Sequence, residues 1–380
     1  MWLTDSIKEF FRKADLVLLG LILAASLYGV ALIYSATRYM ESNRNVLVQL
    51  LSIGLGVVAY MVMSFVDIEL LTERSWKLLL VLSVLAILIL IPFGVERGGN
   101  KSWIDLKVIT IQPAEIVKLP FVVLLAKQMA ALREEGISRL SSLLQMGGHA
   151  LFMCGLIAVV SGDMGMVLVF GFIFLIMAWT AGVKLRWFVL GAAAAAGGVV
   201  LLWPHLPSYI QMRIAILFDH SLDPLGKGFQ QSRSILSIGS GQLSGQGYLS
   251  GIQTQAGNSD ALPARQTDFI FSVAGEELGM VGCLAIMVLL TAIILRCLWV
   301  ARGSRSPQSA LIATGYAGML MVQALLNIGM CLYVAPVVGL TLPFFSAGGS
   351  SIIALFAAMG IVSGIKMRSL PSWLRDRSTL

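Results

Sequence analysis

The stretch DFIFSVAGEELGMVGCLAIMVLLTAIIL, residues 268–295, indicates the fold class most directly. From residue 278 onward it holds no charged side chain and is almost entirely apolar. A helix that crosses the hydrocarbon core of a bilayer needs about 20 such residues. Inside lipid every backbone polar group must be paired within the protein, which favours helices. We therefore predict a membrane-spanning helix over residues 269–295, with the acid Asp268 at its start.

The same pattern recurs along the chain. Of its 380 residues, 57% are hydrophobic and only 12% are charged, whereas soluble proteins carry about 25% charged residues. We therefore predict an all-α polytopic membrane protein that forms one integral membrane domain over residues 1–380. No internal repeat is visible, which disfavours a transporter built from inverted repeats. The ten expected spans are residues 15–36, 46–66, 76–94, 112–131, 144–161, 163–182, 185–203, 269–295, 308–333 and 347–366.

The basic residues predict the orientation of these spans. The net charge is +7, and in a membrane protein Lys and Arg collect in cytoplasmic loops. Roughly twice as many Lys and Arg fall on the side that holds both termini as on the other side. We therefore expect both termini in the cytoplasm and no nucleic-acid partner. The first apolar run is expected to stay as a span and not to be a cleaved signal.

Histidine and cysteine are too few and too scattered for a metal or disulfide framework. Three histidines occur at unrelated positions, and the cysteines lie inside or at the ends of apolar runs. Neither pattern has the spacing of zinc ligands. Zinc or haem chemistry is therefore not expected. The four cysteines are Cys154, Cys283, Cys297 and Cys331.

One connection, residues 204–268, is much longer than the others and is expected on the extracytoplasmic side. Long loops in compact proteins are usually functional or disordered. Residues 208–218 are apolar with one arginine, which is typical of an amphipathic helix in the membrane interface. Residues 226–251 are rich in Gly, Ser and Gln, as in a flexible linker. Apolar residues are interleaved there, however, so we favour a folded cap over the bundle.

Two charged residues interrupt the fourth predicted span. In QPAEIVKLP, residues 112–120, Glu115 and Lys118 are three positions apart, so they share one helix face and can pair. A charged side chain inside a span costs about 2.5–3.5 kcal/mol on insertion scales and usually has a function. Two compatible interpretations remain open: a structural ion pair, or a polar lining of a cavity that opens to the outer leaflet.

An acid at a helix start can be a cap or a reactive group. Asp is a good N-cap residue, and Asp268 precedes a helix predicted from Phe269, although Thr267 could cap it instead. The helix dipole keeps a carboxylate there ionised, which suits a general base. Glu276 and Glu277 follow without a basic neighbour in sequence. They are expected to face a cavity, to pair with a basic group on another helix or to be protonated, and a structural role in helix packing is at least as expected as catalysis.

The outer side is expected to carry basic residues around few carboxylates. Trp103 lies in GGNKSWID, residues 98–105, and is either a membrane-interface anchor or part of a site. Asp163 lies in the tight turn SGDMG, and residues 335–351 are broken by Pro and Gly, which predicts a re-entrant turn. A basic groove with one acid suits an amphiphile with a phosphate head group, since Arg matches phosphate geometry. The basic residues expected there are Lys101, Lys118, Arg213, Lys227, Arg233 and Arg265.

Together these stretches resemble the SEDS proteins of bacteria, named for shape, elongation, division and sporulation. The resemblance runs from about residue 97 to 365 and the motifs are specific in combination; the earlier helices fit the same ten-helix pattern. Two positions depart from the family pattern: Gln266 replaces a frequent His before the TDF triplet, and Ala347 follows Ser346 where many members have Tyr. The matching stretches are SWIDL, QPAEIVKLP, DPLGKGFQQS, IGSGQLSGQGYLSGIQTQ, TDFIFSVAGEELGMVG, LNIGM and GLTLPFFSAGGSS.

The resemblance implies a peptidoglycan glycosyltransferase that polymerises lipid II at the outer face of the bacterial cytoplasmic membrane. It implies that Asp268 is the catalytic acid, that Glu115 and Lys118 are the pair of a QPxExxK motif, and that Trp103 is a family tryptophan. Within the family, the stretch GIQTQ resembles the elongation subgroup (RodA-like), which maintains rod shape, more than the division subgroup (FtsW-like). The residues expected to bind substrate are Trp103, Lys101, Glu115, Lys118, Arg213 and Arg265.

The expected reaction joins two lipid II molecules, with Asp268 as the base that deprotonates the attacking sugar hydroxyl. The departing diphosphate needs positive charge, from a divalent cation (Mg²⁺ or Mn²⁺) or from Arg213 and nearby basic residues. The expected partners are a class B penicillin-binding protein transpeptidase and elongation-complex proteins of the MreC and MreD type. Two alternatives stay open: a lipid II flippase or transporter, and a non-catalytic scaffold for the transpeptidase.

Overall fold

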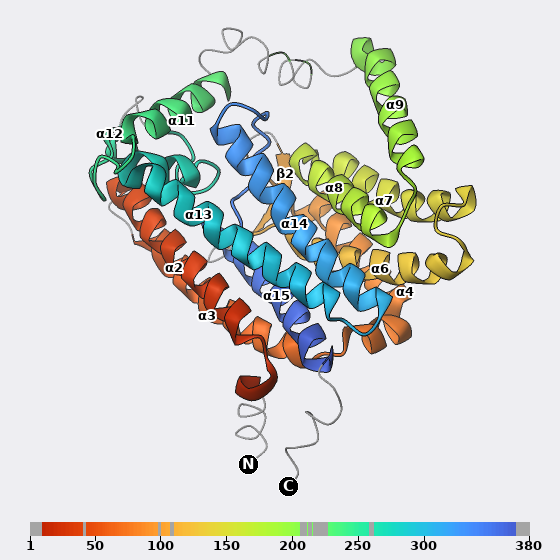
Figure 1. The fold of residues 1–380 in the computed structure, drawn as a ribbon. Helices are drawn as coiled ribbons and strands as arrows, with labels where there is room; N and C mark the ends of the chain where they lie inside the picture. Colours follow the sequence, from red (N-terminus) through yellow and green to blue (C-terminus); the bar gives the residue numbers. More distant parts are fainter. Residues whose placement is uncertain are drawn as a thin grey trace.

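The computed structural model of the chain describes residues 10–40, 43–97, 100–106, 110–205, 211, 215, 227–257 and 262–369. Long helices form one bundle in this part of the chain (Figure 1). The helices of the bundle are α2 (Leu16–Thr37), α3 (Arg44–Phe65), α4 (Ile68–Leu88) continued by α5 (Leu90–Phe93), α6 (Pro113–Glu135), α7 (Leu140–Ser161), α8 (Met164–Ala181), α9 (Leu185–Leu202), α13 (Ile270–Arg302), α14 (Pro307–Cys331) and α15 (Gly349–Ser369).

The prediction of an all-α polytopic membrane fold is confirmed. Each of the ten predicted spans is helical, and eight described helices are long and apolar enough to cross a membrane. Of the two remaining helices, α6 carries charged residues that dilute its hydropathy. In α9, which extends to Leu202, the described apolar stretch is Leu185–Gly198. In Figure 1 α9 stands away from the other helices.

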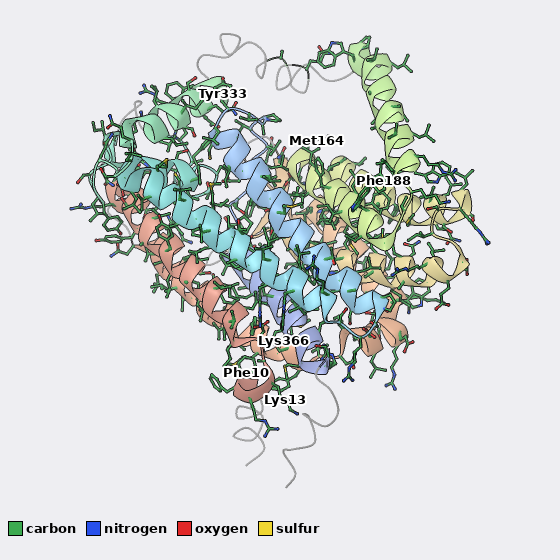
Figure 2. All side chains as sticks on the ribbon, viewed as in Figure 1. Phe10, Lys13, Met164, Phe188, Tyr333 and Lys366 are labelled. Carbon is green, nitrogen blue, oxygen red and sulfur yellow. The ribbon has the colours of Figure 1, made fainter. Side chains whose placement is uncertain are left out.

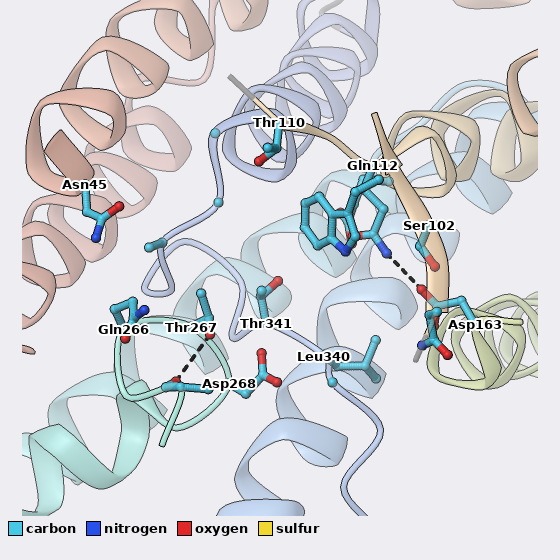
Figure 3. A pocket seen from close by; sticks show the side chains of 18 of the residues that line it. Asn45, Ser102, Thr110, Gln112, Asp163, Gln266, Thr267, Asp268, Leu340 and Thr341 are labelled. Atoms are coloured by element: carbon cyan, nitrogen blue, oxygen red, sulfur yellow. Dashed lines mark hydrogen bonds between the residues drawn. The ribbon is translucent and has the colours of Figure 1, made fainter. Parts of the chain in front are cut away.

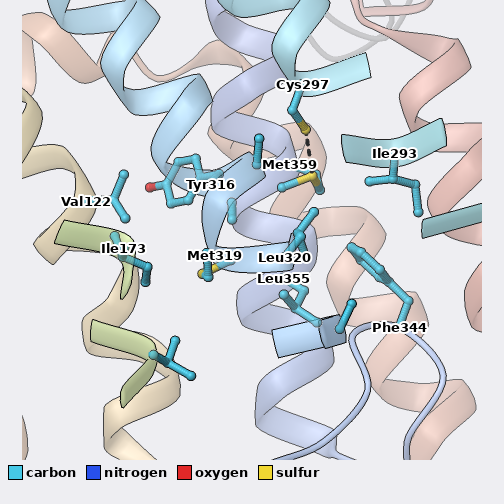
Figure 4. Packing of buried hydrophobic residues seen from close by; sticks show 14 of the residues in the cluster. Val122, Ile173, Ile293, Cys297, Tyr316, Met319, Leu320, Phe344, Leu355 and Met359 are labelled. Carbon is cyan, nitrogen blue, oxygen red and sulfur yellow. Dashed lines mark hydrogen bonds between the residues drawn. The ribbon is translucent and has the colours of Figure 1, made fainter. Parts of the chain in front are cut away.

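The centre of the bundle is built from α14 and α15, the spans with the largest buried share. Figure 4 shows Tyr316 and Met319 of α14 packed with Leu355 and Met359 of α15, and Ile293 of α13 in the same cluster. In lipid there is little hydrophobic force between helices, so close van der Waals packing has to hold them together. The buried centre therefore makes the bundle specific.

Glycine permits a close helix contact between α3 and α15. A Cβ atom added to Gly360 would lie 2.5 Å from the carbonyl oxygen of Tyr60, and one added to Gly56 would lie 2.9 Å from the ring of Phe356. Small residues at such positions let two helix backbones approach each other. Any larger residue at Gly360 would force α15 away from α3.

A buried carboxylate ties three helices together at the end of the bundle that holds the termini. Asp15 caps the N-terminus of α2, because its side chain accepts a hydrogen bond from the Leu18 amide. The same carboxylate pairs with Arg296 of α13, 2.8 Å away, and with Lys366 of α15, 3.2 Å away. Figure 2 labels Lys366 at this end, together with Phe10 near the start of the described chain, and labels Tyr333 and Met164 at the other end.

The opposite end carries a small antiparallel sheet and a folded part of the long loop. The strands β1 (Val95–Arg97), β2 (Asn100–Asp105) and β3 (Thr110–Ile111) pair in that order. In the long loop the structure describes a 3₁₀ turn, η2 (Trp203–His205), and two helices, α11 (Lys227–Gly241) and α12 (Ile252–Gln255). The flexible-linker interpretation is thus wrong for residues 227–251. The predicted amphipathic helix at 208–218 lies outside the described residues, apart from Gln211 and Ala215.

The loop is held against α13 through a break in that helix. At Gly279 the backbone leaves the helical conformation, with φ 66°. The carbonyl groups of Glu276 and Glu277 accept hydrogen bonds from the amides of Gln246 and Gly247, at 2.9 and 3.0 Å. Loop 242–247 therefore satisfies the backbone groups that the break leaves unpaired.

Candidate functional site

A cavity of about 890 Å³ opens at the end of the bundle opposite the termini. Its lining comes from the first turns of α3, α6 and α8, from strands β2 and β3, from residues 264–268 and from residues 337–349. The last of these belong to the non-helical segment between α14 and α15 that was predicted to be a re-entrant turn. Figure 3 shows labelled side chains from several of these elements around one space.

Asp268 lies in the wall of this cavity. Helix α13 begins at Ile270, and Phe269 occupies the position where an N-cap residue would stand. Asp268 therefore precedes the cap position, and the capping interpretation is wrong. Its half-buried carboxylate points into the cavity beside Leu340 and Thr341 (Figure 3). A Cβ atom added to Gly339 would make an ordinary contact with Asp268 Oδ2, at 3.8 Å, whereas the φ of Gly339, 72°, is one that favours glycine.

Hydrogen bonds from α14 and from residues 346–347 fix the main chain around Asp268. The side-chain amide of Asn327 in α14 donates to the Asp268 carbonyl at 2.8 Å and to the Leu340 carbonyl at 2.7 Å. Ser346 Oγ donates to the Thr267 carbonyl at 2.5 Å, and the Ala347 amide donates to the Gln266 carbonyl at 2.9 Å. Two separate segments, α14 and residues 346–347, thus hold the acid in place, as a preorganised site requires.

The Glu115–Lys118 pair of α6 lies beside the same cavity. Lys118 Nζ is 2.8 Å from Glu115 Oε2, and the two side chains are only 1% and 4% exposed. Ser351 Oγ of α15 donates to the same Glu115 oxygen at 3.0 Å. Glu115 lines the cavity, and Lys118 lies one helical turn further into the bundle. Glu115 therefore has both predicted roles: it forms the ion pair and it lines the cavity.

A second buried acid, Asp163, connects the cavity wall at the start of α6 with the wall at the start of α8. Its Oδ2 accepts a hydrogen bond from Gln112 Nε2 at 2.9 Å, and its Oδ1 accepts one from the Met166 amide at the start of α8. Burial raises the pKa of Asp163, partly offset by the hydrogen bonds that the carboxylate receives. The sequence marked Asp163 only as a turn residue, so its place in the cavity wall is a new observation.

Comparison with known proteins places the chain among membrane enzymes of cell-wall synthesis. The family model FtsW/RodA/SpoVE, described as cell cycle protein, matches residues 9–370. The chain belongs to this family. The predicted resemblance to the SEDS proteins is thereby confirmed.

Individual relatives of the family cover nearly the whole chain. The peptidoglycan glycosyltransferase MrdB of Escherichia coli (strain K12) is 31% identical over 94% of this chain and 95% of its own length. The stage V sporulation protein E of Bacillus subtilis (strain 168) is 33% identical over 93% of this chain and 97% of its own length. A probable FtsW of the same Bacillus strain is 30% identical over 95% of this chain and 92% of its own length, so these identities do not separate the subgroups.

Solved structures agree with the fold. A chain from a peptidoglycan synthase complex that coordinates polymerization and crosslinking matches with a TM-score of 0.81 and 29% identity, over 94% of this chain and 98% of that one. The crystal structure of the rod shape determining protein RodA of Thermus thermophilus matches with a TM-score of 0.69 and 26% identity, over 94% and 98%.

The structure places only some of the predicted substrate-binding residues at the cavity. Trp103 of β2 lines the cavity beside Glu115 and Asp268. Lys101 is exposed and donates to the Ile91 carbonyl at 2.7 Å, away from the lining. Arg213 lies outside the described residues.

Arg265 is not in the cavity lining either. It is 2% exposed, and its guanidinium donates to backbone carbonyls of the α12 region. Its predicted contact with substrate is untested, but the position favours a role in holding the neighbouring chain.

The charge of the cavity differs from the predicted basic groove. Among the described residues of the lining, Asp105, Glu115, Asp163 and Asp268 are acidic and Arg44 alone is basic. Of the other predicted cations, Arg233 stacks on Phe229 within α11, 5.0 Å from the ring centroid, and the side chain of Lys227 lies outside the described residues. From the sequence, Arg44 entered only the count of basic residues that predicts the orientation of the spans. Its position just before a predicted span, next to a polar turn, was the feature that could have indicated a place at the site.

Proposed function

We propose that this chain is a peptidoglycan glycosyltransferase that polymerises lipid II into glycan strands at the outer face of the cytoplasmic membrane. Relatives named for this activity cover nearly its full length. The observation that carries the proposal is the Asp268 carboxylate, directed into a polar cavity at one end of a bundle of membrane helices. The similarity to MrdB and RodA, together with the GIQTQ stretch, favours the elongation subgroup and a role in rod shape.

The cavity belongs on the extracytoplasmic side in this proposal. Both ends of the described chain lie at the opposite end of the bundle. In the topology predicted from the sequence, roughly twice as many Lys and Arg residues fall on the side that holds the termini as on the other side. This distribution supports cytoplasmic termini. The reaction would then take place where lipid II displays its disaccharide.

The reaction has one attacking and one leaving oxygen. Asp268 takes the proton from the 4-hydroxyl of the N-acetylglucosamine of the acceptor. That oxygen bonds to the anomeric carbon of the N-acetylmuramic acid of the donor, and the bond from this carbon to the diphosphate oxygen breaks. Undecaprenyl diphosphate leaves with the electron pair, and direct displacement inverts the anomeric carbon.

The charged residues described in the cavity lining are mostly acidic, so the negative charge of a diphosphate has to be balanced there. Arg44 is a cation that can approach the diphosphate, since Arg suits phosphate oxygens. Trp103 offers an aromatic face for a sugar ring in the same wall.

A divalent cation, Mg²⁺ or Mn²⁺, is proposed only as a companion of the diphosphate. Among the described residues no group of three or more His, Cys, Asp or Glu side chains could hold a metal ion. The residues that the structure describes therefore do not fit a resident metal site with three or more such ligands. One or two carboxylates with substrate phosphates are a usual arrangement for Mg²⁺, and Asp268 with its neighbours in the lining can supply that number.

The proposed partner is a class B penicillin-binding protein transpeptidase, which would crosslink the strands made here. Support comes from the related chain solved in a complex that coordinates polymerization and crosslinking. Proteins of the MreC and MreD type would complete an elongation complex.

The proposal is tested with the purified protein in lipid vesicles that contain fluorescent lipid II, with and without the transpeptidase. The expected product is a ladder of glycan chains that a muramidase digests. Movement of lipid II across the bilayer without new glycosidic bonds would instead identify a flippase. Polymer that depends wholly on the active site of the partner would identify a scaffold.

A further inference from the structure

Two adjacent glutamates in α13 hold the short helix α12 in place. Glu276 and Glu277 are fully buried. Glu276 accepts hydrogen bonds from the amides of Gln253 and Thr254, at 2.7 and 2.9 Å, and from Thr254 Oγ1 at 2.6 Å. The two amides are N–H groups in the first turn of α12, which have no partner inside a helix. The carboxylate of Glu276 therefore fixes the N-terminal side of α12.

Glu277 ties the same region to α2. Its carboxylate accepts hydrogen bonds from Ser35 Oγ at 2.6 Å and from Gln255 Nε2 at 2.9 Å. A Cβ atom added to Gly251 would lie 2.9 Å from a carboxylate oxygen of Glu276, so the approach depends on glycine. These contacts replace the ion pair or cavity position expected from the sequence.

Arg265 holds α12 from its other end. Its Nη1 donates to the carbonyl oxygens of Gln253 and Ala256, both at 2.9 Å, and also to that of Thr254. The guanidinium carbon lies 3.6 Å from the ring centroid of Tyr39. A positive group at helix carbonyls and a carboxylate at helix amides both match the dipole of the helix. Glu276 and Arg265 thus grip the two ends of α12.

A short turn connects Arg265 to Asp268. The amides of Thr267 and Phe269 both donate to the Ala264 carbonyl, at 3.1 and 3.2 Å. Ala264 itself has φ 47°, an unusual conformation for a residue with a side chain. A turn that is constrained in this way transmits a displacement of Arg265 to the acid three residues later.

We propose that Glu276, α12 and Arg265 form a clamp that positions the Asp268 carboxylate, with Glu276 and Arg265 as positioning residues that touch no substrate. The inference rests on the proposed function, since it assigns a purpose to the placement of Asp268. Displacing a reacting group by about 1 Å can lower a rate by about 10²-fold. The clamp therefore acts on turnover and not on substrate affinity.

Kinetics of the full-length protein test the clamp, using lipid II polymerisation in vesicles. The variants are Arg265→Lys, Glu276→Gln and the double variant; the controls are Arg133→Lys and Glu134→Gln, both exposed at the end of α6. Each single clamp variant is expected to lower kcat about tenfold or more and to change KM by less than about twofold. The controls are expected to match the wild type. The double variant is expected to lose little more than the worse single variant, because releasing either end frees α12.

Three results would overturn the clamp. The first is a raised KM at unchanged kcat for Arg265→Lys, which means that Arg265 binds substrate. The second is independent losses that multiply in the double variant. The third is a loss of activity that matches the loss of folded protein, measured by thermal unfolding of the same samples. Asp268→Asn is run alongside: activity in that variant contradicts the proposed function, whereas an inactive Asp268→Asn with unaffected clamp variants contradicts only the clamp.

Discussion

Lys118 Nζ lies 2.8 Å from Glu115 Oε2, with both side chains almost fully buried beside the cavity. The pair carries opposite charges three residues apart on α6, so each neutralises the other inside the bundle. Ser351 of α15 donates to the same glutamate oxygen. The pair is therefore both a structural element of the bundle and a part of the cavity wall.

This geometry predicts that the two charges depend on each other. Glu115→Gln or Lys118→Met alone leaves one buried charge without its partner and is expected to cost about 3–5 kcal/mol of stability. The double variant is expected to regain much of this loss in thermal unfolding. Its activity should stay low, because Glu115 also lines the cavity. Losses of stability that simply add in the double variant would show that the pair is not coupled.

Asp163 predicts a pH dependence of stability. Burial raises its pKa above the ordinary 3.8, so the folded protein binds this proton more tightly than the unfolded chain. The cost of an ionised Asp163 is therefore absent below about pH 3.8, appears as pH rises towards the raised pKa, and is full above it. Asp163→Asn can keep the cap of α8 and carries no such cost.

Thermal unfolding of the wild type and of Asp163→Asn over a range of pH measures this effect. The Tm of the variant relative to the wild type should be higher at neutral pH than near pH 4. A difference in Tm that is constant with pH would contradict the raised pKa of Asp163.

A methyl group added at Gly279 is expected to lower stability and to disturb the adjoining loop. The residue has φ 66° and ψ −159°, a conformation open almost only to glycine, and a Cβ atom there would lie 2.4 Å from the Gly245 amide nitrogen. Gly279→Ala is expected to lower stability by several kcal/mol, roughly 2 or more, and to detach loop 242–247.

The matched control for Gly279 is Gly54→Ala. Gly54 lies inside α3, and a Cβ atom there meets nothing within 4 Å. Alanine favours a helix interior by about 1 kcal/mol over glycine, so this variant should be as stable as the wild type or more so. Equal thermal unfolding of the two alanine variants would contradict the importance of the break in α13.

Chelation tests the companion cation. If Mg²⁺ or Mn²⁺ accompanies the diphosphate, EDTA should stop glycan synthesis and added cation should restore it. The Tm of the protein without substrate should not change, since the described residues form no metal site of three or more ligands. Full polymerisation in excess EDTA would remove the cation from the account.

Much of the fold follows from the sequence because lipid imposes simple rules on it. Long apolar runs such as residues 269–295 had to be helices, and the ten predicted spans are all helical. Helix ends were less predictable, since the break at Gly279 depends on loop 242–247, about 30 residues upstream. The Gly-rich composition of that loop suggests flexibility, whereas its glycines in fact allow close backbone contacts.

The site was predictable where a residue stands in a recognisable motif. Asp268, Glu115 and Trp103 were named from the sequence, and all three line the cavity. The pairing of Gln112 with Asp163 was not foreseeable, because it joins segments 51 residues apart. The surroundings of Arg265 were not predictable for a related reason. A count of charges does not show that its guanidinium donates hydrogen bonds to carbonyl groups within residues 253–256.

In the proposed reaction the Asp268 carboxylate moves the proton during glycan polymerisation. The most direct measurement compares polymer formed from lipid II by the wild type, by Asp268→Asn and by Asp67→Asn, an exposed cap of α4 that follows the end of α3 opposite to the cavity. We expect a folded Asp268→Asn protein whose polymerisation falls by about 10²-fold or more, with Asp67→Asn like the wild type. Polymerisation by Asp268→Asn at the wild-type rate would contradict this role of Asp268.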